Sequence, residues 1–344
     1  MGKHCCNGVT VHLKTTPYFS LTKAASNELK GLAIVLVIFS HLGLNLKLDN
    51  GVGLFLLLSG FGLAESYLET GLTRFFLKRL PKVYIPYLAV TVVWILVDVI
   101  CFERHYPWQS IALNLCGLSV APYIDGTMWF IPYILIWYCL FYVVFKYFKN
   151  NNLRSLLLFV ASLLFLFTDS IINPGGAPRT YMCAFPLGVL IGLKFTPWQQ
   201  TISKKRLIPI CSAVFASCLI IFLMIQFEKG IYHLFGCFHH DLINISLKRL
   251  SFTIMAAMMF SLGAGRRTAI RPLGLLGTIA FEMYLVEAKM ITYFHLSEIA
   301  NPFCRGLSAI MAAGFAAYLL RHLVRLFATL AVRFARLPQA SAIV

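Results

Sequence analysis

The stretch LKGLAIVLVIFSHLGL, residues 29–44, is apolar over a length that approaches a membrane span. It contains Lys30 near its start and His41 far inside the apolar run. An ionisable side chain inside a bilayer costs roughly 2.5–3.5 kcal/mol on insertion scales, so such residues usually serve a function. The pattern therefore predicts a membrane helix that carries a functional histidine.

The composition of the 344-residue chain agrees with this prediction. Hydrophobic residues make up 59% of the chain and charged residues only 12%, whereas soluble domains carry about a quarter charged residues. The aromatic content of 14% suits a protein whose rings gather at membrane interfaces. We expect a multi-pass protein of the cell (inner or plasma) membrane.

The net charge of +17 could indicate nucleic-acid binding, but the distribution of the cations favours another explanation. With both termini inside, 22 of the 30 Lys and Arg residues fall in cytoplasmic segments and seven in outer segments. This is the positive-inside pattern, so it predicts an N-in, C-in topology and no nucleic-acid partner. The last predicted helix is long, and we interpret its end as an amphipathic cytoplasmic tail in which four arginines recur: Arg321, Arg325, Arg333 and Arg336.

Apolar stretches separated by polar turns predict an all-α polytopic bundle of about ten transmembrane helices. They lie near residues 29–46, 52–68, 83–102, 126–148, 154–172, 179–195, 207–227, 245–264, 273–294 and 303–332. One membrane domain, residues 29–332, then lies between a cytoplasmic N-terminal segment, residues 1–28, and a cytoplasmic tail, residues 333–344. The longest outer segments, near 103–125 and 228–246, are the expected covers of a site.

Nothing in the sequence indicates a metal centre or a permanently bound cofactor. The ten cysteines form no CxxC pair and have no histidine at zinc-ligand spacing. The outer-loop residues His239, His240 and Asp241 could bind a metal ion or a polar substrate, but adjacent histidines do not easily face one ion. We therefore expect no metal.

Lys30 and His41 are eleven residues apart, which is close to three helical turns, so they share one helix face about 16 Å apart along the axis. Lys30 at the inner end could be a simple interfacial anchor. His41, in the outer half, could act as a general base, because a neutral imidazole accepts a proton near pH 7.

Two further segments of the first half allow a structural and a functional interpretation. The glycines in GVGLFLLLSGFG, at Gly51, Gly53, Gly60 and Gly62, indicate close helix packing. The basic run of the segment RFFLKRLPKVYIPYL consists of Arg74, Lys78, Arg79 and Lys82. This run could be a positive-inside stop before the third helix, or a cytoplasmic anion site in which arginine binds phosphate.

Two later segments carry aromatic and ionisable residues. An interfacial aromatic belt explains Trp129 and Trp137 in GTMWFIPYILIWY. In LLGTIAFEMYLVEAKMI, Glu282 and Lys289 are seven residues apart on one helix face, and we predict that they pair. Glu287 lies on another side and needs its own partner. Three ionisable groups in one span indicate a polar cavity.

The ordered set of motifs resembles acyltransferase family 3, membrane proteins that O-acylate sugars of bacterial polysaccharides and related envelope molecules. KGLAIVLVIFSH matches the family's opening basic residue and its histidine eleven residues later, and GVGLFLLLSGF resembles its glycine-flanked second helix. FFLKRLPKVYIPY, MWFIPYIL and LGTIAFEMYLVE resemble its basic, Trp-centred and late Tyr-Leu-x-His motifs. The resemblance spans roughly residues 27–295. Lys30 replaces the more usual arginine, and Glu287 replaces the late histidine.

The resemblance implies an O-acyltransferase that moves an acyl group, commonly acetyl, from cytoplasmic acyl-CoA to a sugar hydroxyl of an envelope or exopolysaccharide or its lipid-linked precursor, in the bacterial inner membrane. It implies that His41 is catalytic, as a general base or a transient acyl carrier. Lys30, Arg79 and Lys82 would bind the donor, and the acceptor or cavity candidates are Trp129, Glu282, Glu287 and Lys289. The alternative is a transporter or flippase of a lipid-linked sugar, which would also contain intramembrane charges.

Overall fold

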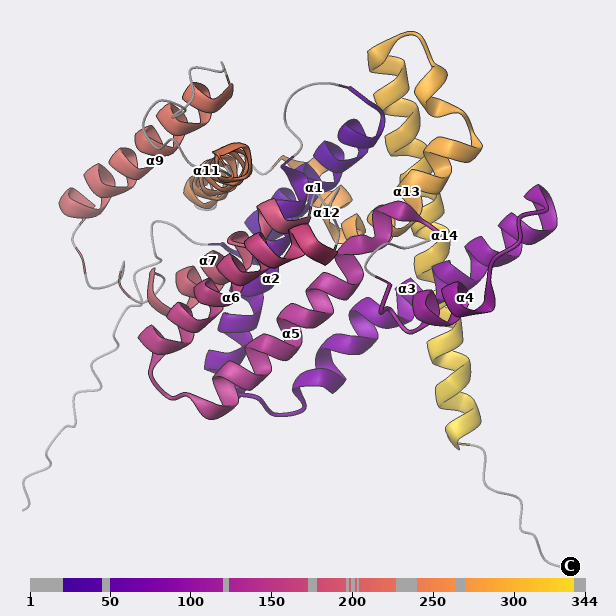
Figure 1. Ribbon diagram of the computed structural model, residues 1–344, viewed down its shortest axis with the longest axis horizontal. Coiled ribbons are helices and arrows are strands. Elements are labelled where there is room, and N and C mark those ends of the chain that lie inside the picture. Colours follow the sequence, from indigo (N-terminus) through magenta and orange to yellow (C-terminus); the bar gives the residue numbers. More distant parts are fainter. Residues whose placement is uncertain are drawn as a thin grey trace, which may run out of the picture.

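The fold was analysed in a computed structural model, which describes residues 21–44, 50–119, 124–172, 178–195, 198, 202, 204–226, 240–263 and 270–336. Twelve α-helices and no strand occur among these residues, so the all-helical prediction is confirmed (Figure 1). The first six helices are α1 (Lys23–His41), α2 (Gly51–Thr70), α3 (Phe75–Phe102), α4 (Trp108–Leu115), α5 (Phe130–Tyr147) and α6 (Asn151–Ile172). The others are α7 (Ala184–Leu190), α9 (Lys204–Gln226), α11 (His240–Gly263), α12 (Arg271–Thr278), α13 (Ala280–Tyr293) and α14 (Pro302–Arg336).

Four short helical turns complete the described elements. Three are 3₁₀ turns: η1 (Gly126–Trp129), η2 (Pro178–Tyr181) and η4 (Leu296–Glu298). The fourth, η3 (Ile191–Phe195), is a π-helical turn that continues α7.

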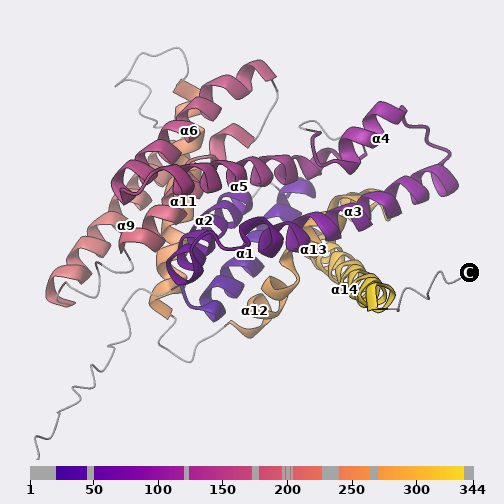
Figure 2. The same cartoon turned by 90° about the horizontal axis from the view of Figure 1, so that it is seen from below.

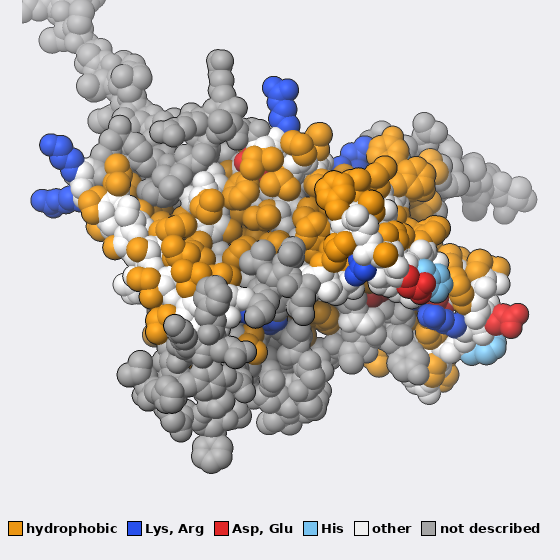
Figure 3. Space-filling view, turned by 90° about the horizontal axis from the view of Figure 1, so that it is seen from above, with side chains coloured by type: hydrophobic (Ala, Val, Ile, Leu, Met, Phe, Trp, Pro, Cys, Tyr) orange, Lys and Arg blue, Asp and Glu red, His pale blue; other side chains and the backbone are white. Residues whose placement is uncertain are grey.

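Six helical segments within the described part of the chain are long and apolar enough to cross a membrane. They are Gly51–Thr70, Phe75–Phe102, Gly126–Tyr147, Lys205–Gln226, Ile243–Ser261 and Pro302–Leu326. Hydrophobic side chains cover a broad area of one face of the molecule, and Lys and Arg side chains lie mostly near its margins (Figure 3). Leu96 of α3 and Phe315 of α14 are 53% and 67% exposed, as expected of side chains that face lipid. The protein is therefore an integral membrane protein.

Several helix boundaries differ from the predicted ones. Helix α3 begins at Phe75, eight residues before the predicted span, and contains Pro81 and Pro86. Lys78, Arg79 and Lys82 of the basic run are thus helical, and Arg74 is the residue that precedes the helix. A helix can begin before its apolar run begins. The predicted ninth span is divided at Ile279 into α12 and α13.

The outer segment predicted near 103–125 contains a helix that folds back beside α3 (Figure 2). The Tyr84 hydroxyl donates to the carbonyl of Leu115 (2.6 Å), and the Tyr87 hydroxyl donates to the carbonyl of Asn114 (2.5 Å). The last carbonyls of a helix have no partner within it. Tyrosines of α3 supply these partners at the end of α4 and hold the returning segment against the bundle.

Glycines set the closest helix contacts, as the sequence predicted for part of the second helix. A Cβ at Gly60 of α2 would collide with the carbonyl oxygen of Phe185, and one at Gly188 of α7 would collide with that of Leu57. Gly62 does not follow this prediction, since a Cβ there would meet open space. Close packing of α2 on α7 therefore depends on Gly60 and Gly188.

We expect Gly60→Ala to destabilise the protein by about 1–3 kcal/mol, the usual cost of overpacking. Gly62→Ala, the same change half a turn away, should be neutral or stabilising by up to about 1 kcal/mol, because alanine favours helix. Thermal unfolding of the purified variants in detergent micelles measures the difference. Equal midpoints for the two variants would contradict the backbone contact at Gly60.

Candidate active site

His41, the last residue of α1, lies against Glu287 of α13. The distance from His41 Nδ1 to Glu287 Oε1 is 2.6 Å, and the two side chains are 32% and 0% exposed. An ionised carboxylate can only accept a hydrogen bond, so Nδ1 donates and Nε2 keeps its lone pair. The contact joins residues 246 positions apart and supplies the partner that the sequence indicated Glu287 must have.

The second carboxylate oxygen of Glu287, Oε2, is buried and has no hydrogen-bond partner among the described residues. The hydrogen bond from His41 to Oε1 is therefore the one hydrogen bond that this carboxylate makes among the described residues. A buried ion in a membrane protein is normally paired, and His41 is the hydrogen-bond partner of this carboxylate within the described structure.

Two hydrogen bonds hold α13 at the residues just before Glu287. The indole nitrogen of Trp94 donates to the carbonyl of Leu285 (3.3 Å), and the Tyr284 hydroxyl donates to the carbonyl of Thr127. Thr127 is held in turn by Asp125 Oδ1, which accepts from its backbone nitrogen (2.9 Å) and its hydroxyl (2.6 Å). Helix α13 is thus held by α3 and η1 at the level of the His41–Glu287 pair.

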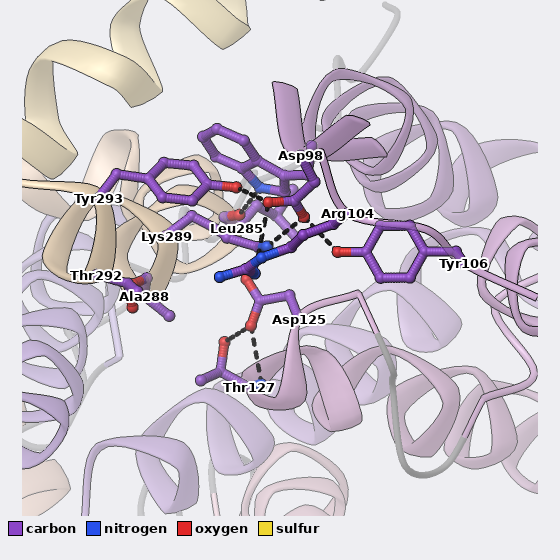
Figure 4. A network of polar contacts seen from close by, with 11 residues as sticks. Asp98, Arg104, Tyr106, Asp125, Thr127, Leu285, Ala288, Lys289, Thr292 and Tyr293 are labelled. Carbon is purple, nitrogen blue, oxygen red and sulfur yellow. Dashed lines mark hydrogen bonds and ion pairs between the residues drawn. The ribbon is translucent and has the colours of Figure 1, made fainter. Parts of the chain in front are cut away.

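On the other side of Glu287, a buried cluster joins α13 to the end of α3 and the following loop (Figure 4). The Asp98 carboxylate is 0% exposed and accepts from Lys289 Nζ (2.6 Å), the Tyr106 hydroxyl (2.5 Å) and the Tyr293 hydroxyl (2.5 Å). Arg104 lies 3.6 Å away and is half exposed. Burial and the neighbouring carboxylate raise the pKa of the Tyr106 hydroxyl to about 12, so it remains a donor at neutral pH.

The predicted pairing of Glu282 with Lys289 is wrong. Arg321 Nε of α14 donates to Glu282 (2.9 Å), and Lys289 binds Asp98. Glu282 and Lys289 share a face, but two helical turns separate them by about 10.5 Å. Other helices bring closer partners.

A cavity of about 570 Å³ is lined on α1 by Lys30, eleven residues before His41. It brings together Lys30 of α1 with Arg79 and Lys82 of α3, the three residues that the resemblance assigned to the donor. It is also lined by Glu282, which was an acceptor or cavity candidate. The Arg79 guanidinium additionally donates to the carbonyl of Gly62 (3.4 Å), another residue of the lining.

Helix α14 lines the same cavity with Arg321 and Arg325. Both residues lie within α14, the long helix that the sequence predicts to end in an amphipathic tail, and this helix packs on α13. They stand four residues apart and so share one helix face. That spacing was visible in the sequence, but only the packing reveals what the face meets. Asp98 was also missed, although an acid inside an apolar run is itself a signal.

Trp129 and Lys289 do not belong to the residues that line the cavity. The Trp129 ring stacks on Tyr181 (centroids 6.4 Å apart, planes at 17°), and the Arg249 guanidinium lies 4.0 Å from the centre of the Tyr181 ring. Trp137 is 0% exposed and stacks on Phe185. The belt interpretation is therefore wrong for Trp137, which is a core residue.

No group of three or more His, Cys, Asp or Glu side chains suited to a metal ion occurs in the described part of the chain. Of the loop candidates, His239 lies outside the described residues, and the side chains of His240 and Asp241 are also not described.

The fold and this site define an integral membrane protein with a histidine paired to a buried carboxylate and with a cationic cavity. A family model for an acyltransferase domain, that of acyltransferase family 3, matches residues 25–331. The chain therefore belongs to acyltransferase family 3 and is an acyltransferase that transfers an acyl group from a donor to an acceptor. No curated protein and no solved structure matched the chain.

The buried Asp98 cluster yields a stability prediction. Lys289→Met should destabilise the protein by about 3–5 kcal/mol, because it leaves the Asp98 carboxylate buried without its ammonium partner. Adding Asp98→Asn removes that uncompensated charge, so the double variant should unfold at a higher temperature than Lys289→Met alone. Thermal unfolding in micelles tests the order. A double variant that is less stable than the single one would contradict the role of the ion pair.

Proposed function

We propose that the protein is an integral membrane O-acyltransferase that moves an acyl group, in the simplest case acetyl, from cytoplasmic acyl-CoA to a sugar hydroxyl of an envelope polysaccharide or its lipid-linked precursor. The observation that supports it most is that α1 joins two chemically different places. The last residue of the helix is His41 with its carboxylate partner, and Lys30, eleven residues earlier, lines a cationic cavity.

The proposed topology has ten spans with both termini inside and one membrane domain, residues 29–332, between the segments 1–28 and 333–344. Every predicted span overlaps described helical residues, although only six helical segments are long and apolar enough to cross a membrane and α1 and α13 are not among these six. Positive-inside orientation then places the cavity on the cytoplasmic side, where acyl-CoA is available.

In this proposal the cavity binds the phosphate groups of the donor. Lys30, Arg79 and Lys82 supply cationic donors from two helices, and charge-assisted hydrogen bonds to phosphate are among the stronger ones. Arg79 is well suited to bidentate binding because its guanidinium is planar. The acyl end of the donor would extend along α1 over the roughly 16 Å between Lys30 and His41.

His41 acts on the acceptor as a general base. Nε2 removes the proton of the sugar hydroxyl while the oxygen attacks the thioester carbonyl, and the tetrahedral intermediate then expels the CoA thiolate, which takes the proton back from the imidazolium. Glu287 fixes the ring through Nδ1 and stabilises the positive charge that the ring gains, as in other histidine–carboxylate arrangements. In the acyl-carrier variant, Nε2 attacks the thioester carbonyl and expels the CoA thiolate, which leaves an acyl-histidine. The sugar hydroxyl then attacks the acyl group and displaces the histidine, and its proton passes to the CoA thiolate.

The other candidates take supporting roles. Trp129 could contribute an aromatic face to the sugar, since its side chain is only partly buried. Lys289 is 7% exposed and bound to Asp98, so we assign it to the scaffold of α13 and not to the acceptor. The transporter alternative is not retained, because the chain belongs to an acyltransferase family.

We expect His41→Ala to lower acyl transfer by on the order of a hundredfold to ten-thousandfold, the usual contribution of general-base catalysis. Glu287→Gln should lower it by about tenfold to a hundredfold, because it weakens one hydrogen bond to a charged group. The assay uses purified protein in lipid nanodiscs with labelled acetyl-CoA and a sugar acceptor.

His322→Ala provides a matched control, because His322 is an exposed histidine of α14 that contacts Tyr318 and takes no part in the proposed site. It should retain transfer. Membrane abundance should be the same for all three variants. Wild-type transfer by His41→Ala would contradict the assignment of the base.

A further inference from the structure

The residue that precedes α2, Asn50, has a buried side-chain amide without a hydrogen-bond partner. Asn50 is 0% exposed, and neither Nδ2 nor Oδ1 makes a hydrogen bond in the described structure. An asparagine at this position commonly accepts a hydrogen bond from the first turn of the helix, but here the side chain makes no such bond. Buried polar groups are normally hydrogen-bonded, so this amide requires an explanation.

The first turn of α2 adds further donors beside this amide. Gly51, Val52 and Gly53 are buried, and their backbone nitrogens make no hydrogen bond to the described residues. The first N–H groups of a helix have no partner within it, and the helix dipole adds a partial positive charge at this end. Together with the Asn50 amide, these groups form a place inside the bundle that favours a negatively charged oxygen.

This end of α2 lies against the face of α1 that carries Lys30 and His41. A Cβ added to Gly51 would collide with the carbonyl oxygen of Ala33 and with the side chain of Val37. Val37 follows Lys30 by seven residues and precedes His41 by four, so the three residues share one face of the helix. The N-terminus of α2 therefore meets α1 about one turn, or roughly 6 Å along the axis, before His41.

Farther along the chain, α2 lines the donor cavity. Four of its residues belong to the lining: Phe55, Leu58, Ser59 and Gly62. Phe55 follows Asn50 by five residues, or about 7.5 Å of helix rise. The proposed function takes the acyl group from the cavity to His41. On that route the unpartnered donors of α2 come after the cavity and before the histidine.

We propose that the Asn50 amide and the first N–H groups of α2 form the oxyanion site of the acyl transfer. This inference rests on the proposed function, since it takes the thioester carbonyl to react beside His41. When the sugar oxygen attacks the carbonyl carbon, the π bond of the carbonyl breaks and its electron pair moves to the carbonyl oxygen. Asn50 Nδ2 and the α2 N–H groups donate to this oxyanion. The electron pair then restores the carbonyl and expels the CoA thiolate, which takes the proton from the His41 imidazolium.

Donors of this kind act on the chemical step and not on donor binding. The full negative charge that they meet exists only in the tetrahedral intermediate and the transition states that flank it. An interaction made only there raises kcat and leaves the KM of the substrate nearly unchanged. The ratio of the effects on kcat and on KM therefore distinguishes an oxyanion site from a site that binds acetyl-CoA.

Purified Asn50→Ala and Asn50→Leu in lipid nanodiscs test the proposal, with labelled acetyl-CoA and a sugar acceptor. Both should lower kcat by about a hundredfold to a thousandfold, the usual effect of removing one oxyanion donor, and keep the KM for acetyl-CoA near the wild-type value. Leucine refills the space that alanine leaves, so equal losses identify the missing donor as the cause. Neither variant should unfold at a lower temperature than the wild type, because the amide makes no hydrogen bond in the described structure.

Asn114→Ala is the matched control, because Asn114 is also buried but its amide donates to the carbonyl of Ser110 (2.8 Å). It should lower the unfolding temperature and keep the wild-type kcat. A wild-type kcat in Asn50→Ala, a loss confined to the KM for acetyl-CoA, or recovery of kcat in Asn50→Leu would overturn the inference, while transfer by the wild type upholds the proposed function. Absence of transfer by the wild type would overturn both.

Discussion

The arrangement of this bundle depends on the need to compensate ionisable groups inside the membrane. Helix α13 carries three of them, and each is paired with a different helix: Glu287 with His41 of α1, Lys289 with Asp98 of α3, and Glu282 with Arg321 of α14. Leaving one charge of such a pair buried alone costs several kcal/mol. Because the three groups pair with three different helices, α13 fixes the positions of α1, α3 and α14 around it.

The same three contacts of α13 determine where the cationic cavity and the His41–Glu287 pair lie. The helices that α13 gathers are also those that contribute cations to the cavity: Lys30 from α1, Arg79 and Lys82 from α3, and Arg325 from α14. The pair His41–Glu287 lies on two of the same helices. The donor cavity and the proposed base are thus parts of one rigid set, and a change in the position of α13 would affect both.

The sequence allowed much of the fold to be predicted, because the length of an apolar run directly reflects the thickness of a bilayer. It also allowed Lys30 and His41 to be placed on one face of a helix. It did not allow the partners of the ionisable residues of α13 to be predicted. Glu287 meets a residue 246 positions away, and local spacing instead favoured Glu282 with Lys289. Likewise, the spacing of Arg321 and Arg325 defined a face but not the cavity that it lines, and the hydropathy of segment 103–119 did not reveal that α4 returns along α3.

The central claim is that the donor binds in the cavity lined by Lys30, on the cytoplasmic side, and that the acceptor reacts at His41. Transfer in sealed proteoliposomes of known protein orientation tests it most directly, with labelled acetyl-CoA and a membrane-impermeant sugar acceptor each confined to one side. We predict product only when the donor is on the side of the N-terminus and the acceptor is on the opposite side. Product formed only with donor and acceptor on the same side would contradict the account.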